Sequence, residues 1–226
     1  MLLLPILLLV GAAALGAWAQ RAVLGRFQRF AAIPNRAGLS GAEVAQAILA
    51  ARELQDIRVE RTEGRLSDHY DPRQRVLRLS PEVHDGRSVS SLGIAAHEAG
   101  HALQEAMNYA PLGMRNLAVP TAQLGSLIGL PVLLLGAFLH SPAIALLGFV
   151  LYAGVVLFQL VTVPVELDAS RRALTSLQEM RLLDPGEEEQ GVQEVLSAAS
   201  MTYVAAALSG LAVLLYYGLQ VFGRRR

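Results

Sequence analysis

The sequence predicts an α-helical membrane protein with about four transmembrane helices and a small polar region of α+β structure. Two observations predict this class. Of the 226 residues, 53% are hydrophobic and only 17% are charged, against roughly 25% charged residues in an average globular protein. The apolar residues are also gathered into long uncharged stretches, close to or above the roughly 20 residues that cross a bilayer.

The first predicted element is an uncharged, leucine-rich stretch from Leu2 to Trp18. No positive charge precedes it, and the arginines of "RAVLGRFQRF" follow it, which favours a retained N-terminal transmembrane anchor over residues 1–19. "AWAQ", at residues 17–20, loosely resembles the cleavage site of a signal peptide, which is the alternative interpretation. We expect the retained anchor.

The second and third spans come from one stretch without charged residues between Arg115 and Glu166. This stretch has about twice the length of a single crossing. "LHSPA" divides it near its middle, because proline disfavours helix in the residue before it. We predict a transmembrane hairpin over residues 117–164, then a last transmembrane helix and basic tail over 198–226.

The larger polar region, residues 20–116, contains signals for both helices and strands. Ser40 and Glu43 form a capping-box pattern before a helical run. "IRVER" and "RVLRLS" alternate apolar and polar residues as half-buried strands do, and "SDHYDPRQ" between them is typical of a turn or loop. A second helix is expected to begin at Ser88 or Ser90 and to stop before the next proline.

The smaller polar region, residues 165–197, is acidic and is predicted to be helical, with "DPGEEE" as an exposed break. Glu166 and Asp168 are expected to begin this helix directly after the third span, beside two arginines. The chain has no cysteine, so any metal must be held by nitrogen and oxygen. Its formal net charge is zero, and we expect no nucleic acid partner.

The second predicted helix carries the sequence "HEAGH", with His97 and His101 four residues apart and Glu98 beside the first. Residues i and i+4 share one face of a helix, so both imidazoles can bind one metal ion. In this HExxH arrangement the glutamate serves as general base toward a water that the metal activates. The alternative is a surface helix with two solvated histidines. The small and apolar neighbours favour a metal site, because burying these side chains without partners is costly.

Two histidines do not complete a catalytic zinc site, which usually has three protein ligands. In "VPVELDASRRA" the carboxylates of Glu166 and Asp168 are the strongest further candidates. We predict Glu166 as the third ligand. Asp168 is expected to be a helix N-terminal charge paired with arginine.

Three segments, "SDHYDPRQRVLRLS", "AAHEAGHALQ" and "VPVELDASRRAL", together resemble the YugP-type family of bacterial membrane zinc metallopeptidases. The resemblance implies a zincin-like catalytic region, Zn²⁺ as cofactor and a polypeptide substrate. The chain is more distantly similar to HtpX-like membrane proteases, in which an E-x-x-A segment supplies the third ligand and an aspartate follows the alanine. Here that segment places the ligand on Glu166, but Ser170 stands where those relatives have the aspartate, and Asp168 is a candidate substitute.

The chain has three other histidines, His69, His84 and His140. His69 and Tyr70 could donate a hydrogen bond to the oxyanion of a reacting carbonyl. The alternative is a turn in which Asp71 bonds the backbone and His69 faces water. His84 and His140 are expected to lie in loops. The strand "RVLRLS" is a candidate edge for an extended substrate, or simply a core strand.

The sequence therefore predicts a membrane-embedded zinc endopeptidase, with His97, His101 and Glu166 as ligands and Glu98 as base. Quality control of membrane proteins is the role that the HtpX resemblance suggests. The alternatives are a non-catalytic zinc-binding scaffold or sensor, and an intramembrane (site-2-type) metalloprotease. The positive-inside rule favours a multi-pass protein of the bacterial cytoplasmic membrane with its site on the cytoplasmic side. Three arginines lie at the C-terminus. Seven flank the proposed catalytic side: Arg21, Arg26, Arg29, Arg36, Arg115, Arg171 and Arg172.

Overall fold

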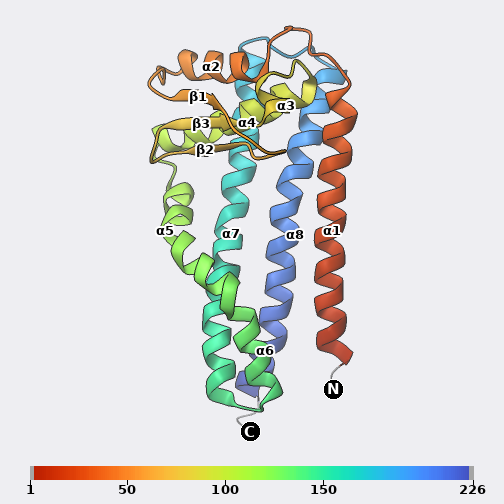
Figure 1. Cartoon of the computed structure of the whole chain (residues 1–226), viewed down its shortest axis with the longest axis vertical. Helices are drawn as coiled ribbons and strands as arrows, with labels where there is room; N and C mark the ends of the chain where they lie inside the picture. Colours follow the sequence, from red (N-terminus) through yellow and green to blue (C-terminus); the bar gives the residue numbers. More distant parts are fainter. Residues whose placement is uncertain (1–2, 224–226) are drawn as a thin grey trace. The chain divides into compact units, whose positions relative to one another are not determined.

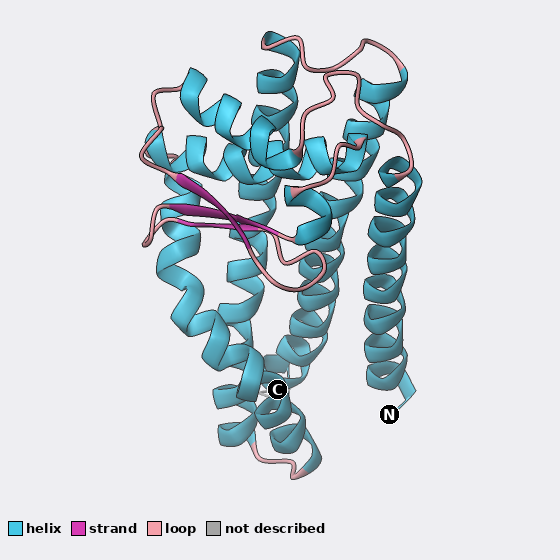
Figure 2. Ribbon diagram, turned by 45° about the horizontal axis from the view of Figure 1, so that its top comes forward, coloured by secondary structure: helices cyan, strands magenta, loops and turns pink. Residues whose placement is uncertain are grey.

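The computed structural model describes residues 3–223, so the start of the first predicted span at Leu2 and the predicted basic tail of Arg224–Arg226 lie outside the described residues. The chain is mainly helical with one small sheet (Figures 1 and 2). Its elements are α1 (Leu3–Ala31), α2 (Gly41–Ala51), β1 (Arg58–Arg61), β2 (His69–Asp71), β3 (Val76–Leu79), α3 (Pro81–His84), α4 (Val89–Ala106), α5 (Ala110–Leu124), the π-helical turn η1 (Gly125–Gly129), α6 (Leu130–Phe138), α7 (Pro142–Glu179) and α8 (Glu187–Gly223).

The residues form two compact units, which are described separately. The apolar unit contains Met1–Ala19, Ala110–Pro164 and Met201–Arg226. The sheet unit contains Gln20–Tyr109 and Val165–Ser200. Helices α1, α7 and α8 each contribute residues to both units.

The apolar unit exposes many large hydrophobic side chains, among them Leu117, Leu127 and Phe138. Such surfaces are unfavourable in water and are expected where lipid surrounds the helices. Within residues 3–223, four helical segments are long and apolar enough to cross a membrane, as predicted: Leu3–Ala31, Ala110–Phe138, Pro142–Glu179 and Glu187–Phe222.

The hairpin of the apolar unit turns at residues 139–141, where "LHSPA" predicts the break, and His140 adopts a positive φ of 51° there. Its first arm already begins at Ala110, before the predicted start at residue 117. Proline is tolerated in the first turn of a helix, which is why Pro111 does not delay this start. Gly136 lies against α7 so closely that a Cβ there would overlap the backbone of Ala145.

The sheet unit contains a three-stranded sheet in the order β1-β3-β2 (Figure 1). β1 pairs with β3 in parallel, and β2 pairs with β3 in antiparallel register. The predicted strands correspond to β1 and β3. The prediction of a turn or loop throughout "SDHYDPRQ" was wrong in part, because residues 69–71 form the edge strand β2. β3 is therefore the central, buried strand and cannot be the free edge proposed for a substrate.

The predicted helices of the sheet unit are present with the expected caps. Ser40 and Glu43 form the capping box of α2, and the Ser88 side chain caps α4 by accepting a hydrogen bond from the Ser91 backbone N–H. The core gathers apolar side chains from α1, α2, the sheet, α4, α7 and α8. The predicted helix break lies between α7 and α8, at residues 180–186.

One prediction about helix boundaries was wrong and affects the site. Glu166 and Asp168 do not begin a helix; they lie in the middle of the continuous 38-residue helix α7. Pro164, which precedes them, is accommodated inside the helix at the loss of one backbone hydrogen bond. The N-terminal helix charge expected for Asp168 is therefore excluded, and Glu166 is held on a rigid element.

Candidate metal centre

The two histidines of "HEAGH" meet Glu166 inside the sheet unit. The Nε2 atoms of His97 and His101 lie 3.2 Å and 3.6 Å from Oε2 of Glu166. One ligand atom from each of the three residues lies within 4.8 Å of the others. Two ligand atoms bound to one tetrahedral zinc ion are separated by roughly 3.3 Å. The spacing in this cluster is therefore compatible with a shared metal ion.

Gly100 explains how α4 and α7 come close enough for this cluster to form. A Cβ at Gly100 would lie 2.6 Å from the carbonyl oxygen of Ala169 and 3.3 Å from its Cα. A close approach of backbone to backbone is one reason to keep glycine inside a helix despite its cost of up to about 1 kcal/mol. Ala169 is completely buried at this contact. The backbone of α7 thus fills the space that the missing side chain of Gly100 leaves on α4.

His101 is oriented by Gln104, which the sequence analysis did not single out. Nδ1 of His101 lies 3.0 Å from Oε1 of Gln104, an atom that can only accept a hydrogen bond. The Gln104 amide nitrogen donates to the Val165 carbonyl oxygen and to Oδ2 of Asp168. With Nδ1 as the donor, Nε2 of His101 carries the free lone pair that metal binding requires. Gln104 stands three residues after His101, a spacing that could have identified it.

His97 is oriented by a hydroxyl group. Oγ of Ser170 lies 3.1 Å from Nδ1 of His97 and 3.3 Å from Oγ of Ser200. Ser170 thus stands where an aspartate is expected from the HtpX-like pattern, and it contacts the histidine itself. Asp168 does not substitute for that aspartate at His97: it binds Arg171 and Arg172, and it reaches the centre only through Gln104. The predicted arginine pairing of Asp168 is present.

Glu98 lies beside the cluster and is largely buried, with 8% of its surface exposed. The negative charge of Glu98 helps to raise the pKa of two neighbouring side chains, His101 and Asp68. Burial opposes the charged form of His101, but the bond to Glu166 and the charges of Glu98 and Glu166 outweigh it, so the pKa of His101 is raised. Burial and the Glu98 charge also raise the pKa of Asp68, against hydrogen bonds from Ser80.

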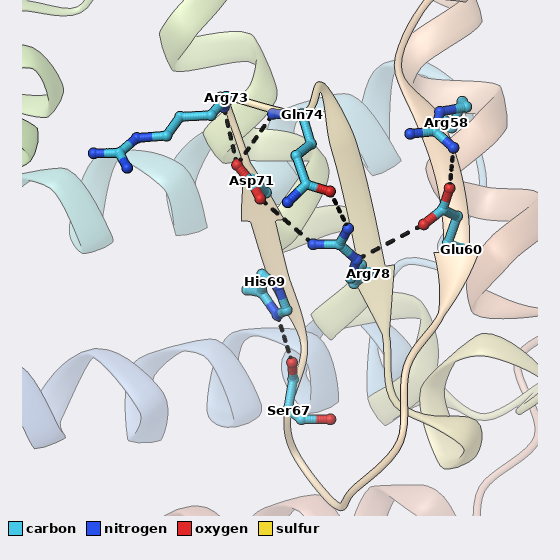
Figure 3. Close-up of polar contacts among 8 residues, drawn as sticks. All are labelled: Arg58, Glu60, Ser67, His69, Asp71, Arg73, Gln74 and Arg78. Carbon is cyan, nitrogen blue, oxygen red and sulfur yellow. Dashed lines mark hydrogen bonds and ion pairs between the residues drawn. The ribbon is translucent and has the colours of Figure 1, made fainter.

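His69 and Asp71 belong to β2 and not to the cluster, and Figure 3 shows their polar contacts. His69 is exposed and its Nδ1 contacts the carbonyl oxygen of Ser67. Asp71 accepts hydrogen bonds from the backbone N–H groups of residues 73 and 74, which is the turn predicted as the alternative. The Tyr70 hydroxyl donates to Glu105 of α4, and burial together with this bond raises the pKa of Tyr70, so it stays protonated.

His84 and His140 also lie outside the cluster. His84 is the last residue of the short helix α3, so its prediction as a loop residue was wrong. Nδ1 of His84 contacts the carboxylate of Asp85, 2.7 Å away. His140 lies in the turn between α6 and α7. Neither residue belongs to the group of three that the described residues bring together.

The alternative of a solvated surface helix is inconsistent with this geometry, because Glu166, Glu98 and His97 are all buried. Two imidazole nitrogens and one carboxylate oxygen are a donor set typical of zinc peptidases. The chain belongs to the family described as "Putative neutral zinc metallopeptidase", which matches residues 5–221.

A curated relative is the "Putative membrane protease YugP" of Bacillus subtilis (strain 168). It is 41% identical over 215 residues, which cover 95% of this chain and 95% of the relative. No solved structure matches the chain.

Proposed function

We propose that this protein is a membrane-embedded zinc-dependent endopeptidase that hydrolyses peptide bonds. The observation that carries the proposal is the convergence of His97, His101 and Glu166 on one point, with the buried carboxylate of Glu98 beside them. The three residues would hold the ion. Zinc in such a site would supply Lewis acidity, which polarises a carbonyl group and lowers the pKa of water toward neutral pH.

Glu98 is the proposed general base. Glu98 is largely buried, and its charge helps to raise the pKa of His101, so its carboxylate lies close to the cluster. Beside the cluster, Glu98 can take a proton from the attacking water and pass it to the leaving amine. Gln104 and Ser170 act by holding the two imidazole rings in the tautomer that directs Nε2 inward. They are positioning residues.

The edge strand β2 is the proposed place for an extended substrate. It borders the sheet on one side and packs against α4, which carries the HExxH sequence. The hydrogen bond from Tyr70 to Glu105 ties this edge to α4. A peptide added to β2 would run beside the metal cluster. Tyr70→Phe should raise the KM for a peptide and leave the zinc content unchanged; an unchanged KM would contradict this placement.

The protein is proposed to act on membrane proteins in quality control, a role that rests on its resemblance to HtpX-like proteases. The site is proposed to face the cytoplasm, since seven arginines flank that side and only three occupy the C-terminal end. Labelling of single cysteines introduced near Arg65 and at residue 140 of the cysteine-free chain would test it. Labelling of the residue near Arg65 from outside intact cells would contradict the proposed orientation and place the site on the outer face.

Two alternatives make different predictions. An intramembrane protease would carry its HExxH sequence inside a span, but α4 is not among the four apolar segments found in residues 3–223. A zinc-binding scaffold or sensor would need the three ligands without needing Glu98 as a base. The buried carboxylate of Glu98 beside the ligands favours the enzyme.

The test combines metal content with hydrolysis. Detergent-purified protein should contain about one zinc per chain, and Glu166→Ala should lose most of it. Glu98→Gln should keep the zinc but lose about 10²–10⁴-fold in the hydrolysis of an unfolded protein such as casein. Glu105→Gln is the matched control on the same helix, and its amide oxygen can still accept the Tyr70 hydrogen bond.

Each outcome selects one interpretation. Zinc retained by Glu166→Ala would remove Glu166 from the ligand set. An active Glu98→Gln enzyme would exclude Glu98 as the base. Zinc in every form of the protein except Glu166→Ala, with no hydrolysis by any form, would favour the scaffold.

A further inference from the structure

A polar cavity lies in the sheet unit, apart from the metal cluster. Its volume is about 520 Å³, and it is lined by three arginines, two hydroxyl residues and several apolar side chains. Arg52, Arg171 and Arg172 supply the positive charge, and Leu54, Leu103 and Met107 are among the apolar lining. No acidic residue lines it. None of the proposed metal ligands lines it either.

The arginines have donors and charge left for a ligand. Arg52 binds Glu179, while Arg171 and Arg172 both bind the buried Asp168. Three guanidinium groups against two carboxylates leave one positive charge. In their hydrogen bonds to the described residues, Arg52 and Arg171 each use a single guanidinium nitrogen, whereas a guanidinium carries five N–H donors. The cavity therefore suits a group with one negative charge and several acceptor oxygens.

The apolar part of the lining narrows the chemistry of that group. Met107 is 67% exposed and Leu103 is buried, so an apolar surface runs from the exterior to the arginines. A free inorganic anion would gain nothing from this surface. An amphiphile with an anionic head and an apolar tail would contact both parts of the lining.

The position of the arginines along α7 indicates where such an amphiphile comes from. The uncharged stretch of α7 ends at Val165, and Arg171 follows six residues later, about 9 Å along the helix axis. The interfacial layer on each side of the hydrocarbon core is roughly 5–8 Å thick. A long arginine side chain can reach back over the remaining distance. The cavity therefore lies at the depth of lipid headgroups if this stretch of α7 spans the membrane.

We propose that this cavity binds the headgroup of an anionic phospholipid, with Arg52, Arg171 and Arg172 on the phosphate and the apolar lining against the first part of an acyl chain. One diester phosphate balances the one uncompensated positive charge. The site depends on the membrane attachment of the chain but not on its proposed peptidase activity.

The test uses the full chain, purified and delipidated in a non-ionic detergent. Native mass spectrometry would measure the binding of phosphatidylglycerol and of phosphatidylcholine with the same acyl chains. Wild type should bind one phosphatidylglycerol at least about tenfold more tightly than phosphatidylcholine. Both lipids carry the phosphodiester, but the cationic choline group of phosphatidylcholine is repelled by the uncompensated arginine charge. The double variant Arg52→Gln/Arg171→Gln should lose this preference.

The control is Arg61→Gln/Arg65→Gln, which removes the same charge from exposed arginines of the sheet unit outside the cavity. It should bind the lipid as wild type does. Thr175→Glu is a second test if the first double variant does not fold. It places a negative charge at an exposed position of the cavity lining and should weaken phosphatidylglycerol binding about tenfold.

Three results would overturn the proposal. The first is equal affinity for the two lipids in wild type. The second is an equal loss of binding in the cavity variant and in the Arg61→Gln/Arg65→Gln control, because the effect would then be one of net charge. The third is displacement of the lipid by millimolar inorganic phosphate, because the occupant would then be a free anion.

Discussion

Two helix pairs of this chain approach each other through glycine, and they differ in the side chains beside it. α4 meets α7 at Gly100 in the sheet unit, and α6 meets α7 at Gly136 in the apolar unit. The residues three before and one after Gly100 are His97 and His101. The corresponding residues around Gly136 are Leu133 and Ala137.

Close packing of two helices at a glycine does not by itself create a functional site. In the apolar unit it buries leucine and alanine and yields packing energy alone. In the sheet unit the same approach brings two imidazoles to a carboxylate on the opposite helix. The position of the polar residues relative to the glycine makes the difference.

Removal of the metal should produce the largest difference in behaviour between the two helix pairs. An ion held by α4 and α7 stabilises the folded state by about 3–4 kcal/mol when it is present at 100–1,000 times its Kd. Chelation should therefore speed hydrogen exchange in α4 and in residues 165–179 by about a hundredfold or more. Exchange in α6 and in residues 142–155 should change little. Equal acceleration in both regions would show that no ion links α4 to α7.

Gly100→Ala and Gly136→Ala form a matched pair. Each forces a Cβ against backbone atoms of α7 and should cost about 1–3 kcal/mol of stability. Only Gly100→Ala should also weaken zinc binding, by about tenfold or more, because it moves the histidines away from Glu166. Denaturation and zinc titration of both variants would measure the two effects. Weaker zinc binding in both variants would mean that lost stability, not helix separation, lowers the affinity.

Gln104→Met should weaken zinc binding about 10–100-fold, since it removes the acceptor that orients His101 while keeping the volume of a fully buried side chain. Competition with a fluorescent zinc chelator would measure this. Gln178→Met is the control on the exposed surface of the same unit and should bind zinc as wild type does. Unchanged affinity in Gln104→Met would show that packing alone holds the His101 ring.

Ser170→Ala should have the smallest effect, because a neutral hydrogen bond contributes only about 0.5–1.5 kcal/mol. We expect zinc affinity to fall by a factor of about 2–10 on loss of the contact with His97. Ser170→Asp should raise the affinity, since a carboxylate makes the imidazole a stronger ligand. Ser126→Ala, which loses a hydroxyl bond in the apolar unit, is the control. Weaker zinc binding in Ser170→Asp would contradict the assigned contact.

The site could be predicted from the sequence where local spacing determines the geometry. His97 and His101 share a helix face because they are four residues apart, and Ser88 begins that helix through its side chain. The four apolar helices follow from the length and composition of uncharged stretches. These features depend on neighbours within a few residues or on composition alone, so the order of residues by itself determined them.

Other features depend on segments far apart in the chain, and only the tertiary structure decided them. β2 is an edge strand of the sheet because β3 pairs with β1 on one side and with β2 on the other. The residues of β2 are themselves typical of a turn. Gln104 and Ser170 became partners of the histidines because α4 and α7 touch at Gly100 and Ala169. Glu166 lies inside a continuous helix because tertiary packing outweighs the local effect of Pro164. The helices and the donors that they carry follow from local sequence, whereas the packing of α4 on α7 sets which donors meet, because long-range contacts leave no local pattern.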